Sequence, residues 1–321
     1  MKILVLHSDV ADDAPPEDQD TLIAARAVSE ALRSRGHATA LAAFKPDLAA
    51  LQQTLARERP AVVFNLVEAV FGSGLYAALA PAMLGRLGVA YSGGTAAHFM
   101  ATTDKLFAKS VLRAAGLPTP DWCVPPRWEG LDPARRYIVK AADEDASVGL
   151  DDAAVVAGGE VAARADACAR RHGGRWFAEA YVEGREFNLS LLGEAGGVRI
   201  LPMAEMLFVG WPTDKPRIVG YAAKWHEASA DYGGTPRRFG VERDEPALAA
   251  ALAELCRRTW AAFGLCGFAR IDFRVGEGGP TILEINPNPG IAPDAGFAAA
   301  AAEAGLGYAE TIEKIVLAAL A

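Results

Sequence analysis

Cysteine is scarce in this chain and widely spread. The 321 residues include four cysteines, and none of them stands in a Cys-x-x-Cys pair. This spacing indicates neither a zinc site nor a disulfide framework, so we expect reduced core cysteines in a cytoplasmic protein. They are Cys123, Cys168, Cys256 and Cys266.

An excess of positive charge is also lacking. The chain has 32 lysines and arginines against 40 aspartates and glutamates, a formal net charge of -8. Because neutralising nucleic-acid phosphates needs clustered surplus basic residues, we expect no nucleic-acid partner. A net negative charge does not exclude a polyanionic small ligand, since a few well-placed lysines can make a local positive pocket.

Long hydrophobic runs are missing as well. No window approaches the ~20 apolar residues of a membrane helix without a charge or a break at glycine or proline. The apolar run at residues 3–6 is short, and acidic residues follow from Asp9, which does not fit a signal peptide. We therefore expect neither membrane attachment nor export.

The beginning of the chain lacks a glycine-rich dinucleotide loop. Residues 3–6 are typical of a strand buried on both faces, but the following turn, His7-Ser8-Asp9, contains no G-x-G-x-x-G. A helical stripe over 21–35, a strand at 61–64 and a helix over 75–87 continue the alternation. We predict a small α/β domain over residues 1–103.

Two further units, both α+β, are predicted. In the second, 104–186, strands at 137–140 and 176–182 accompany helices over 103–115 and 160–171, with Thr103 or Asp104 as the first N-cap. In the third, 187–321, we expect strands at 187–192, 267–275 and 281–285 and helices over 246–263, 297–302 and 308–320. Residues 208–238, rich in glycine, proline and charge, predict a long functional loop.

Two of the predicted strands each place one carboxylate, Asp272 or Glu284, among apolar residues. Burying such groups is costly unless a cation compensates. If the strands are neighbours, Asp272, Glu284 and Asn286 converge as hard oxygen ligands, which Mg²⁺ prefers, usually alongside phosphate oxygens. The alternative is that Arg270 and Asp272, which share one face, pair with each other and support the core.

Several lysines and glutamates could serve a nucleotide, but each is ambiguous alone. Lys140 ends a strand, where a compact charge could reach a phosphate or simply be exposed. Lys105 and Lys224 are equally ambiguous. Glu179 and Glu186 could accept hydrogen bonds from a base and a ribose, or be solvated carboxylates.

The order of these motifs is more specific than any one of them. It runs Lys105, Lys140 with a Ser-Val-Gly loop, Glu179-x-Tyr-Val-Glu-Gly-x-Glu186-Phe, Lys224, Arg270-x-Asp272 and Glu284-x-Asn286-Pro-x-Pro-Gly290. Over essentially the whole chain it resembles the ATP-grasp superfamily, and within it the D-alanine:D-alanine ligase branch. The resemblance implies an α/β (α+β) ATP-grasp fold of three units, an N-terminal α/β domain plus two α+β subdomains that clamp ATP.

The resemblance also implies a nucleotide site. Lys105 and Lys140 would contact the ATP phosphates, and Lys224 would close over them from the long loop. The other residues implied are Glu179 for the adenine amino group, Tyr181 and the backbone of Val182 beside the ring, Glu186 for the ribose, and Ser147 and Gly149 in the loop over the phosphates.

The catalytic centre implied by the resemblance uses metal ions. Asp272, Glu284 and Asn286 would hold two Mg²⁺ ions, or Mn²⁺ in their place. Arg270 and the backbone N–H of Gly290 would stabilise a tetrahedral oxyanion. The implied activity is an ADP-forming carboxylate–amine ligase, in which ATP converts a carboxylate into an acyl phosphate that an amine attacks.

The amino-acid half of the pattern departs from the branch. Only Glu17 falls where the substrate-binding Glu of the family's Gly-Gly-x-Ser-Ala-Glu-Arg segment would lie, so it is the remaining candidate catalytic residue there. The His-Gly of the family's second strand loop is replaced by Glu68-Ala69.

Three further departures remove hydroxyl groups. The first Ser of the phosphate loop is Ala146, and its Tyr partner after the loop lysine is Trp225. The late Ser that binds the second substrate's carboxylate is Ala295, preceded by Asp294. We therefore expect a different carboxylate and amine, with a cationic or amine-bearing acceptor, and Glu68, Trp225 and Asp294 as further substrate residues.

Three alternatives remain at this point. A true D-alanine:D-alanine ligase requires a different register in these loops. A non-catalytic nucleotide-binding homologue should have lost the metal ligands, which are present. A nicotinamide oxidoreductase lacks its glycine fingerprint here. The expected partners are small molecules, and the branch is often dimeric, so a homodimer is the oligomer that the resemblance allows.

Overall fold

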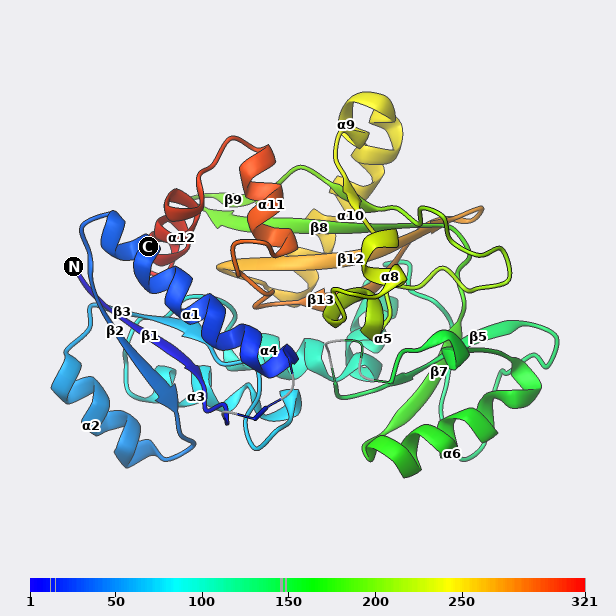
Figure 1. The fold of residues 1–321 in the computed structure, drawn as a ribbon, viewed down its shortest axis with the longest axis horizontal. Helices are drawn as coiled ribbons and strands as arrows, with labels where there is room; N and C mark the ends of the chain where they lie inside the picture. Colours follow the sequence, from blue (N-terminus) through cyan, green and yellow to red (C-terminus); the bar gives the residue numbers. More distant parts are fainter. Residues whose placement is uncertain (12, 15, 145–146, 148, 321) are drawn as a thin grey trace.

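Three β-sheets organise the chain in the computed structural model, which describes residues 1–11, 13–14, 16–144, 147 and 149–320 but not the side chains of 16–18 (Figure 1). Each sheet is built from one continuous part of the chain. The sheets follow one another in the order of the three predicted units, and the boundaries after residues 103 and 186 stay a prediction.

The first sheet is parallel, with the strand order β2-β1-β3. Its strands are β1 (Lys2–Ser8), β2 (Ala38–Phe44) and β3 (Val62–Leu66). Ile3 and Val5 pack in a core with α1 (Pro16–Ser34), whereas Leu4 and Leu6 pack in a core with α2 (Leu48–Glu58) and α3 (Leu79–Arg86). The prediction of a strand buried on both faces is confirmed.

The single helix predicted over 75–87 is wrong in its first part. A 3₁₀ turn, η1 (Gly74–Tyr76), comes first, and α3 begins only at Leu79. The Ser73 hydroxyl accepts a hydrogen bond from the backbone N–H of Leu75 at 3.2 Å. This N-cap makes η1 a separate turn.

The helix predicted over 103–115 is present as α5 (Lys105–Ala114). A further helix, α4 (Ala96–Thr103), was not predicted and ends just before Asp104. Asp104 Oδ1 accepts hydrogen bonds from the N–H groups of Leu106 and Phe107, both at 3.0 Å. Asp104 is therefore the N-cap of α5, and Thr103 instead ends the preceding helix.

The second sheet is antiparallel, with the order β4-β7-β5-β6. Its strands are β4 (Trp122–Cys123), β5 (Arg136–Ala141), β6 (Val155–Ala157) and β7 (Trp176–Ala180), with α6 (Val161–His172) and the turns η2 (Asp152–Ala154) and η3 (Gly158–Glu160) beside them. Tyr137 and Val139 pack in the core with α6. The alternation of a strand therefore turns Lys140 to the opposite face.

The third sheet has the order β11-β10-β8-β12-β13, and β9 pairs with β8. Its strands are β8 (Arg185–Glu194), β9 (Gly197–Ile200), β10 (Ala204–Met206), β11 (Arg237–Arg238), β12 (Phe268–Gly276) and β13 (Gly279–Asn286). Phe187, Ile271 and Phe273 pack in a core with α10 (Pro246–Phe263). One face of this sheet is thus covered by a helix.

Helices from the two ends of the chain share a core. α11 (Gly296–Glu303) and α12 (Tyr308–Ala318) complete the core between α1 and the first sheet, where Ile312 and Val316 are buried with Val28. Figure 1 accordingly shows the N- and C-termini at the same side of the molecule. The first and third sheets are therefore joined through common packing.

Two expectations from the sequence need correction. Residues 208–238 are not one long loop, because they contain α7 (Tyr221–Trp225), α8 (Ala230–Gly234) and β11, and α9 (Val241–Asp244) follows. The cysteines are free, but Cys266 is exposed and is not a core residue. Within the described ranges, no helix is long and apolar enough to cross a membrane.

Candidate active site

A cavity of about 990 Å³ is lined by residues from β5, β7, β8, β12 and β13 and from the loop after β3. Lys105 lines a pocket of about 40 Å³ that shares Lys140, Ser147 and Glu284 with the cavity. The other predicted residues that line the cavity are Glu68, Glu179, Tyr181, Val182, Glu186, Lys224, Trp225, Arg270, Asp272, Asn286, Gly290 and Asp294. The structure thus brings most of the predicted set together.

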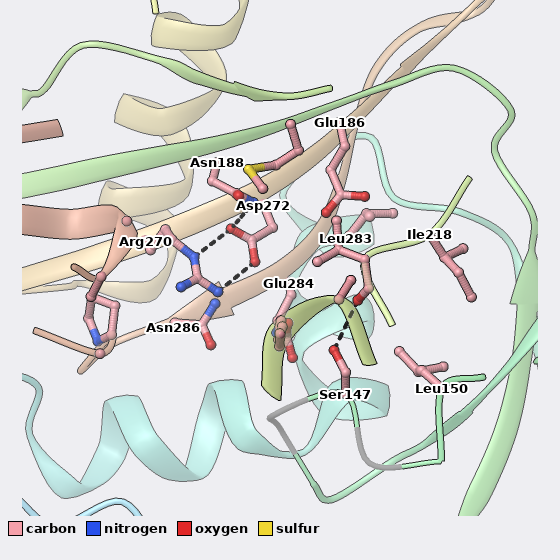
Figure 2. Close-up of a pocket in the computed structure, with 18 of the residues that line it drawn as sticks. Ser147, Leu150, Glu186, Asn188, Ile218, Arg270, Asp272, Leu283, Glu284 and Asn286 are labelled. Carbon is pink, nitrogen blue, oxygen red and sulfur yellow. Dashed lines mark hydrogen bonds and ion pairs between the residues drawn. The ribbon is translucent and has the colours of Figure 1, made fainter. Parts of the chain in front are cut away.

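The register of β12 and β13 puts the predicted metal ligands on one face. Asp272 pairs directly with Glu284, and Arg270 pairs directly with Asn286, so the two strands are the neighbours that the sequence interpretation required. Figure 2 shows these four side chains in one region of the cavity, with Ser147 among the other residues that line it.

A β-bulge adjusts this face. The register shifts between Asp272 and Phe273, so that Phe273 pairs with Ile282 and Leu283 is the additional residue. Ile282 and Ile285 are buried in the core under α10, while Leu283 and Glu284 both line the cavity. The bulge therefore places the apolar side chain of Leu283 in the cavity lining beside the carboxylate of Glu284.

Arg270 and Asp272 form the ion pair that was the alternative to a metal site. Arg270 Nε donates to Asp272 Oδ1 at 2.7 Å, and the guanidinium Nη2 donates to Oδ2 at 2.9 Å. Asn188 Nδ2 also donates to Oδ1, at 2.8 Å. Both side chains line the cavity, so the pair holds Asp272 in a defined orientation at the site.

Glu284 has a cationic partner as well. Lys105 Nζ lies 3.1 Å from Glu284 Oε1 and donates to the carbonyl oxygen of Glu144 at 2.6 Å. Lys105 is buried. The first residue of α5 is therefore fixed between the loop after β5 and the face of β13.

The oxygen donors of this face suit a hard divalent cation. Asp272 and Glu284 supply two carboxylates, and Asn286 supplies an amide whose nitrogen is buried and has no hydrogen-bond partner among the described residues. Across the same residues, no group of three or more His, Cys, Asp or Glu side chains could hold a metal ion. A cation bound here would therefore need further oxygens from its ligand or from water.

Glu179 lines the cavity and is buried between two lysines. Its Oε1 lies 2.6 Å from Lys140 Nζ, and its Oε2 lies 2.6 Å from Lys109 Nζ. Burial alone would raise the pKa of Glu179, but Lys109 and Lys140 outweigh it and hold that pKa below its ordinary value. The carboxyl group is therefore ionised at neutral pH.

Glu186 and Tyr181 also line the cavity. Glu186 Oε2 pairs with the buried guanidinium of Arg274 at 3.0 Å. Arg217 N donates to the Tyr181 hydroxyl at 3.1 Å, and Arg274 donates to the carbonyl oxygen of Arg217. The segment before α7 is thus tied to the loop between β7 and β8.

The loop after β5 also contacts the segment before α7. Ser147 Oγ donates to the Val219 carbonyl oxygen at 3.2 Å, and Tyr221 N donates to the Leu150 carbonyl oxygen at 2.9 Å. Gly149, in contrast, is not among the described cavity-lining residues. It has a φ of +69°, and a Cβ there would lie 2.5 Å from the Trp176 ring, so glycine is required for packing.

Three acidic side chains, those of Asp20 in α1, Glu68 and Asp294, also line the cavity, as do Trp225 and Arg237. Burial and the nearby Asp294 raise the pKa of Asp20. The predicted Glu17 begins the same helix, but its side chain lies outside the described residues, as does Ala146.

Cations that line the cavity are mostly paired. Lys140, Arg270 and Arg274 each contact a carboxylate of the cavity. Lys224 and Arg237 are the lining cations without an ion pair to any described carboxylate. An anionic ligand would thus meet Lys224 directly but would have to exchange partners to reach Lys140.

Several polar residues of the site were missed from the sequence, among them Asp20 and Arg237, which line the cavity. Asn188 and Arg274 could have been found. Each lies two residues after a predicted site residue in the same strand, Asn188 after Glu186 and Arg274 after Asp272, and so shares its face. Lys109 and Glu144 gave no such signal. Lys109 lies in a helix and Glu144 in a loop, and only the tertiary structure shows what they contact.

Comparison with known proteins agrees with this geometry. The family described as "D-ala D-ala ligase C-terminus" matches residues 135–317, more than half of the chain. The chain belongs to the D-alanine:D-alanine ligase family. It is an ATP-grasp protein and an ATP-dependent ligase of this family.

Relatives match over nearly the full length. A D-alanine--D-alanine ligase of Moorella thermoacetica is 30% identical over 98% of this chain and 98% of its own. An uncharacterized protein of Sinorhizobium fredii is 29% identical over 94% of this chain and 89% of its own. The crystal structure of the Bacillus anthracis D-alanine--D-alanine ligase complexed with ATP has a TM-score of 0.76 at 18% identity, covers 100% of this chain and 97% of its own, and shows the same fold.

A contact between residues 73–74 and the loop after β5 gives a first prediction. Ser73 Oγ donates to Glu144 Oε1 at 2.7 Å, and Gly74 N donates to Oε2 at 3.4 Å. A hydrogen bond to a charged, partly exposed group contributes about 1 kcal/mol. Ser73→Ala should therefore raise the KM for ATP by about fivefold, measured by coupled ADP release.

The control for this variant is Ser34→Ala. Ser34 donates to the Ala31 carbonyl oxygen at the end of α1 and has no contact with the loop. We expect an unchanged KM for ATP in the control. An equal KM in both variants would show that the Ser73 contact does not hold the loop.

Proposed function

We propose that the ligase uses ATP and Mg²⁺ to activate a substrate carboxylate as an acyl phosphate and joins it to an amine, with a substrate pair other than two molecules of D-alanine. The observation that supports this most is the direct pairing of Asp272 with Glu284 across β12 and β13, in one cavity with Lys140 and Lys224. Oxygen donors beside lysines suit a metal-bound polyphosphate.

The nucleotide would lie between the second and third sheets. Lys105, Lys140 and Lys224 would meet its phosphates, Ser147 would lie over them, and Glu179, Tyr181, Val182 and Glu186 would surround the adenosine. Gly149 would act indirectly, by shaping the loop that contains Ser147. Units 104–186 and 187–321 would then form the clamp, and unit 1–103 would add the substrate side.

Asp272, Glu284 and Asn286 would hold Mg²⁺, which when bound neutralises the charge that develops on the transferred phosphoryl group. Arg270 would then stabilise the oxyanion formed when the amine attacks, together with the N–H of Gly290. Arg270 is already oriented by its two hydrogen bonds to Asp272. Contacts of Ser147 with Val219 and of Leu150 with Tyr221 would help to exclude water, which would hydrolyse the acyl phosphate.

Acidic residues of the cavity lining support a cationic or amine-bearing acceptor. Asp20, Glu68 and Asp294 line the cavity, while Ala295 provides no hydroxyl group for a carboxylate. Glu17 stays a prediction for the acceptor side. Negative charge at a binding site attracts an ammonium group and repels a second carboxylate.

A screen of substrate pairs tests this proposal. Phosphate release from ATP and Mg²⁺ is measured with amino acids as acids and with amino acids, dipeptides and diamines as acceptors, and each product is identified by mass. We expect a pair with an amine-rich acceptor to exceed two D-alanines by at least about tenfold in kcat/KM, the worth of one good polar contact.

The outcomes separate the alternatives. D-alanyl-D-alanine as the sole product would contradict the proposed specificity and favour the function named for the Moorella thermoacetica relative. No ATP turnover with any pair, together with unchanged ATP affinity in Asp272→Asn and Glu284→Gln, would contradict the ligase mechanism itself.

A further inference from the structure

A buried lysine lies behind Glu179, a residue of the cavity lining. Lys109 is on α5, its side chain is 2% exposed, and it is not among the described residues that line the cavity. Its Nζ lies 2.6 Å from Glu179 Oε2 and 2.9 Å from Thr119 Oγ1, to which it donates, and 3.3 Å from the Pro120 carbonyl oxygen. Three oxygens therefore hold one ammonium group in place.

Glu179 thus has two lysine partners of different kinds. Lys140 lines the cavity and its side chain is 14% exposed, so a ligand in the cavity can reach it. Lys109 is enclosed by protein on the far side of the same carboxylate. If Lys140 turned towards a ligand without Lys109 present, Glu179 would stay behind as a buried, unpaired charge, which is strongly unfavourable.

Among the residues that the structure describes, Lys140 and Lys109 are the cations paired with Glu179. Arg113 lies on the same helix, but its guanidinium stacks over the Trp122 ring, 4.1 Å from the centroid, and pairs with Asp121 at 2.8 Å on the surface. Lys109 Nζ lies 5.6 Å from the centroid of the same ring. The charge that faces Glu179 from α5 therefore comes from Lys109.

We propose that Lys109 is a positioning residue for the nucleotide site: its permanent ion pair with Glu179 allows Lys140 to leave that carboxylate and bind a nucleotide phosphate. The inference rests on the proposed function, in which Lys140 contacts a phosphate and Glu179 contacts the base. Lys109 acts only through Glu179 and touches neither ATP nor the reacting atoms.

The test is steady-state kinetics of the full chain with Lys109→Met. Because Glu179 would then retain Lys140, the KM for ATP should rise at least about tenfold while kcat changes less than about threefold. Lys314→Met is the matched control, since Lys314 pairs with Glu310 on the exposed side of α12. We expect the control to leave the KM for ATP unchanged.

A double-mutant cycle keeps the test decisive if Lys109→Met fails to fold. In Glu179→Gln the charge that retains Lys140 is absent. Adding Lys109→Met to that variant should therefore keep the KM for ATP within about twofold of the value for Glu179→Gln alone. A role in stability alone would lower the melting temperature without this dependence on Glu179.

Two results overturn the inference. One is a folded Lys109→Met with the wild-type KM for ATP. The other is a double variant whose KM for ATP clearly exceeds that of Glu179→Gln. A wild-type chain that binds no ATP by calorimetry would contradict the proposed function and this inference together, whereas wild-type binding that Lys109→Met leaves unaltered contradicts the inference alone.

Discussion

Replacing Arg270 with methionine lowers kcat by about 10²–10³-fold, the usual loss when one preorganised oxyanion donor is removed. Arg270 presents its guanidinium to the cavity from β12 and is oriented by Asp272. The negative charge that it meets forms only when the amine attacks. The KM for ATP should therefore change by less than about threefold, because Arg270 is not proposed to contact the nucleotide.

The matched control for this variant is Arg127→Met. Arg127 is 82% exposed, and its partner among the described residues is the exposed Glu129. Its kcat should equal that of the wild type. Retention of wild-type kcat in Arg270→Met would remove this residue from the chemical step and leave its pair with Asp272 as a structural contact.

Glu284→Gln and Asp272→Asn lower kcat/KM by at least about 100-fold and raise the Mg²⁺ concentration needed for half-maximal rate. Each variant removes one charged oxygen donor from the facing pair on β12 and β13, and metal sites lose at least this much when a ligand is exchanged. The measurement is a Mg²⁺ titration of phosphate release at saturating ATP.

The two variants also differ in a way that the structure defines. Asp272→Asn removes the partner of Arg270, whereas Glu284→Gln removes the partner of Lys105. Asp272→Asn should therefore lower kcat more, since it disturbs the oxyanion donor as well. Glu303→Gln, an exposed carboxylate at the end of α11, is the control. An unchanged Mg²⁺ requirement in both variants would contradict the metal assignment.

The site could be predicted from the sequence where the residues lie on regular strands. Asp272, Glu284 and Asn286 follow the period of two among apolar neighbours, so their convergence needed only that β12 and β13 pair. The bulge at Leu283 could not be predicted, because nothing in the local pattern fixes which residue is additional.

The ion pairs between elements of the site could not be predicted from the sequence. Lys140 was expected to be a phosphate contact or an exposed strand end, and the structure pairs it with Glu179. That contact joins β5 to β7, and its second half depends on Lys109 from a helix. Contacts of this kind depend on the packing of separate elements, which one sequence does not specify.

Fold prediction failed mainly in short or alanine-rich elements. β2, Ala-Thr-Ala-Leu-Ala-Ala-Phe, lacks the continuous apolar run of β1 and was not predicted. β10 and β11 have three and two residues and take their stability from pairing with β8 and with each other. In contrast, the predicted bounds of α10 were confirmed at 246–263, where Pro246 begins the helix and Gly264 follows it.

The central claim is that ATP activates a carboxylate as an acyl phosphate, and the transfer of oxygen from that carboxylate tests it most directly. The acid that supports turnover is labelled with ¹⁸O in its carboxylate, and the released phosphate is analysed by mass. The account predicts one ¹⁸O atom in the phosphate for each amide bond formed, because the carboxylate oxygen attacks phosphorus and leaves with the phosphate. Unlabelled phosphate would contradict it.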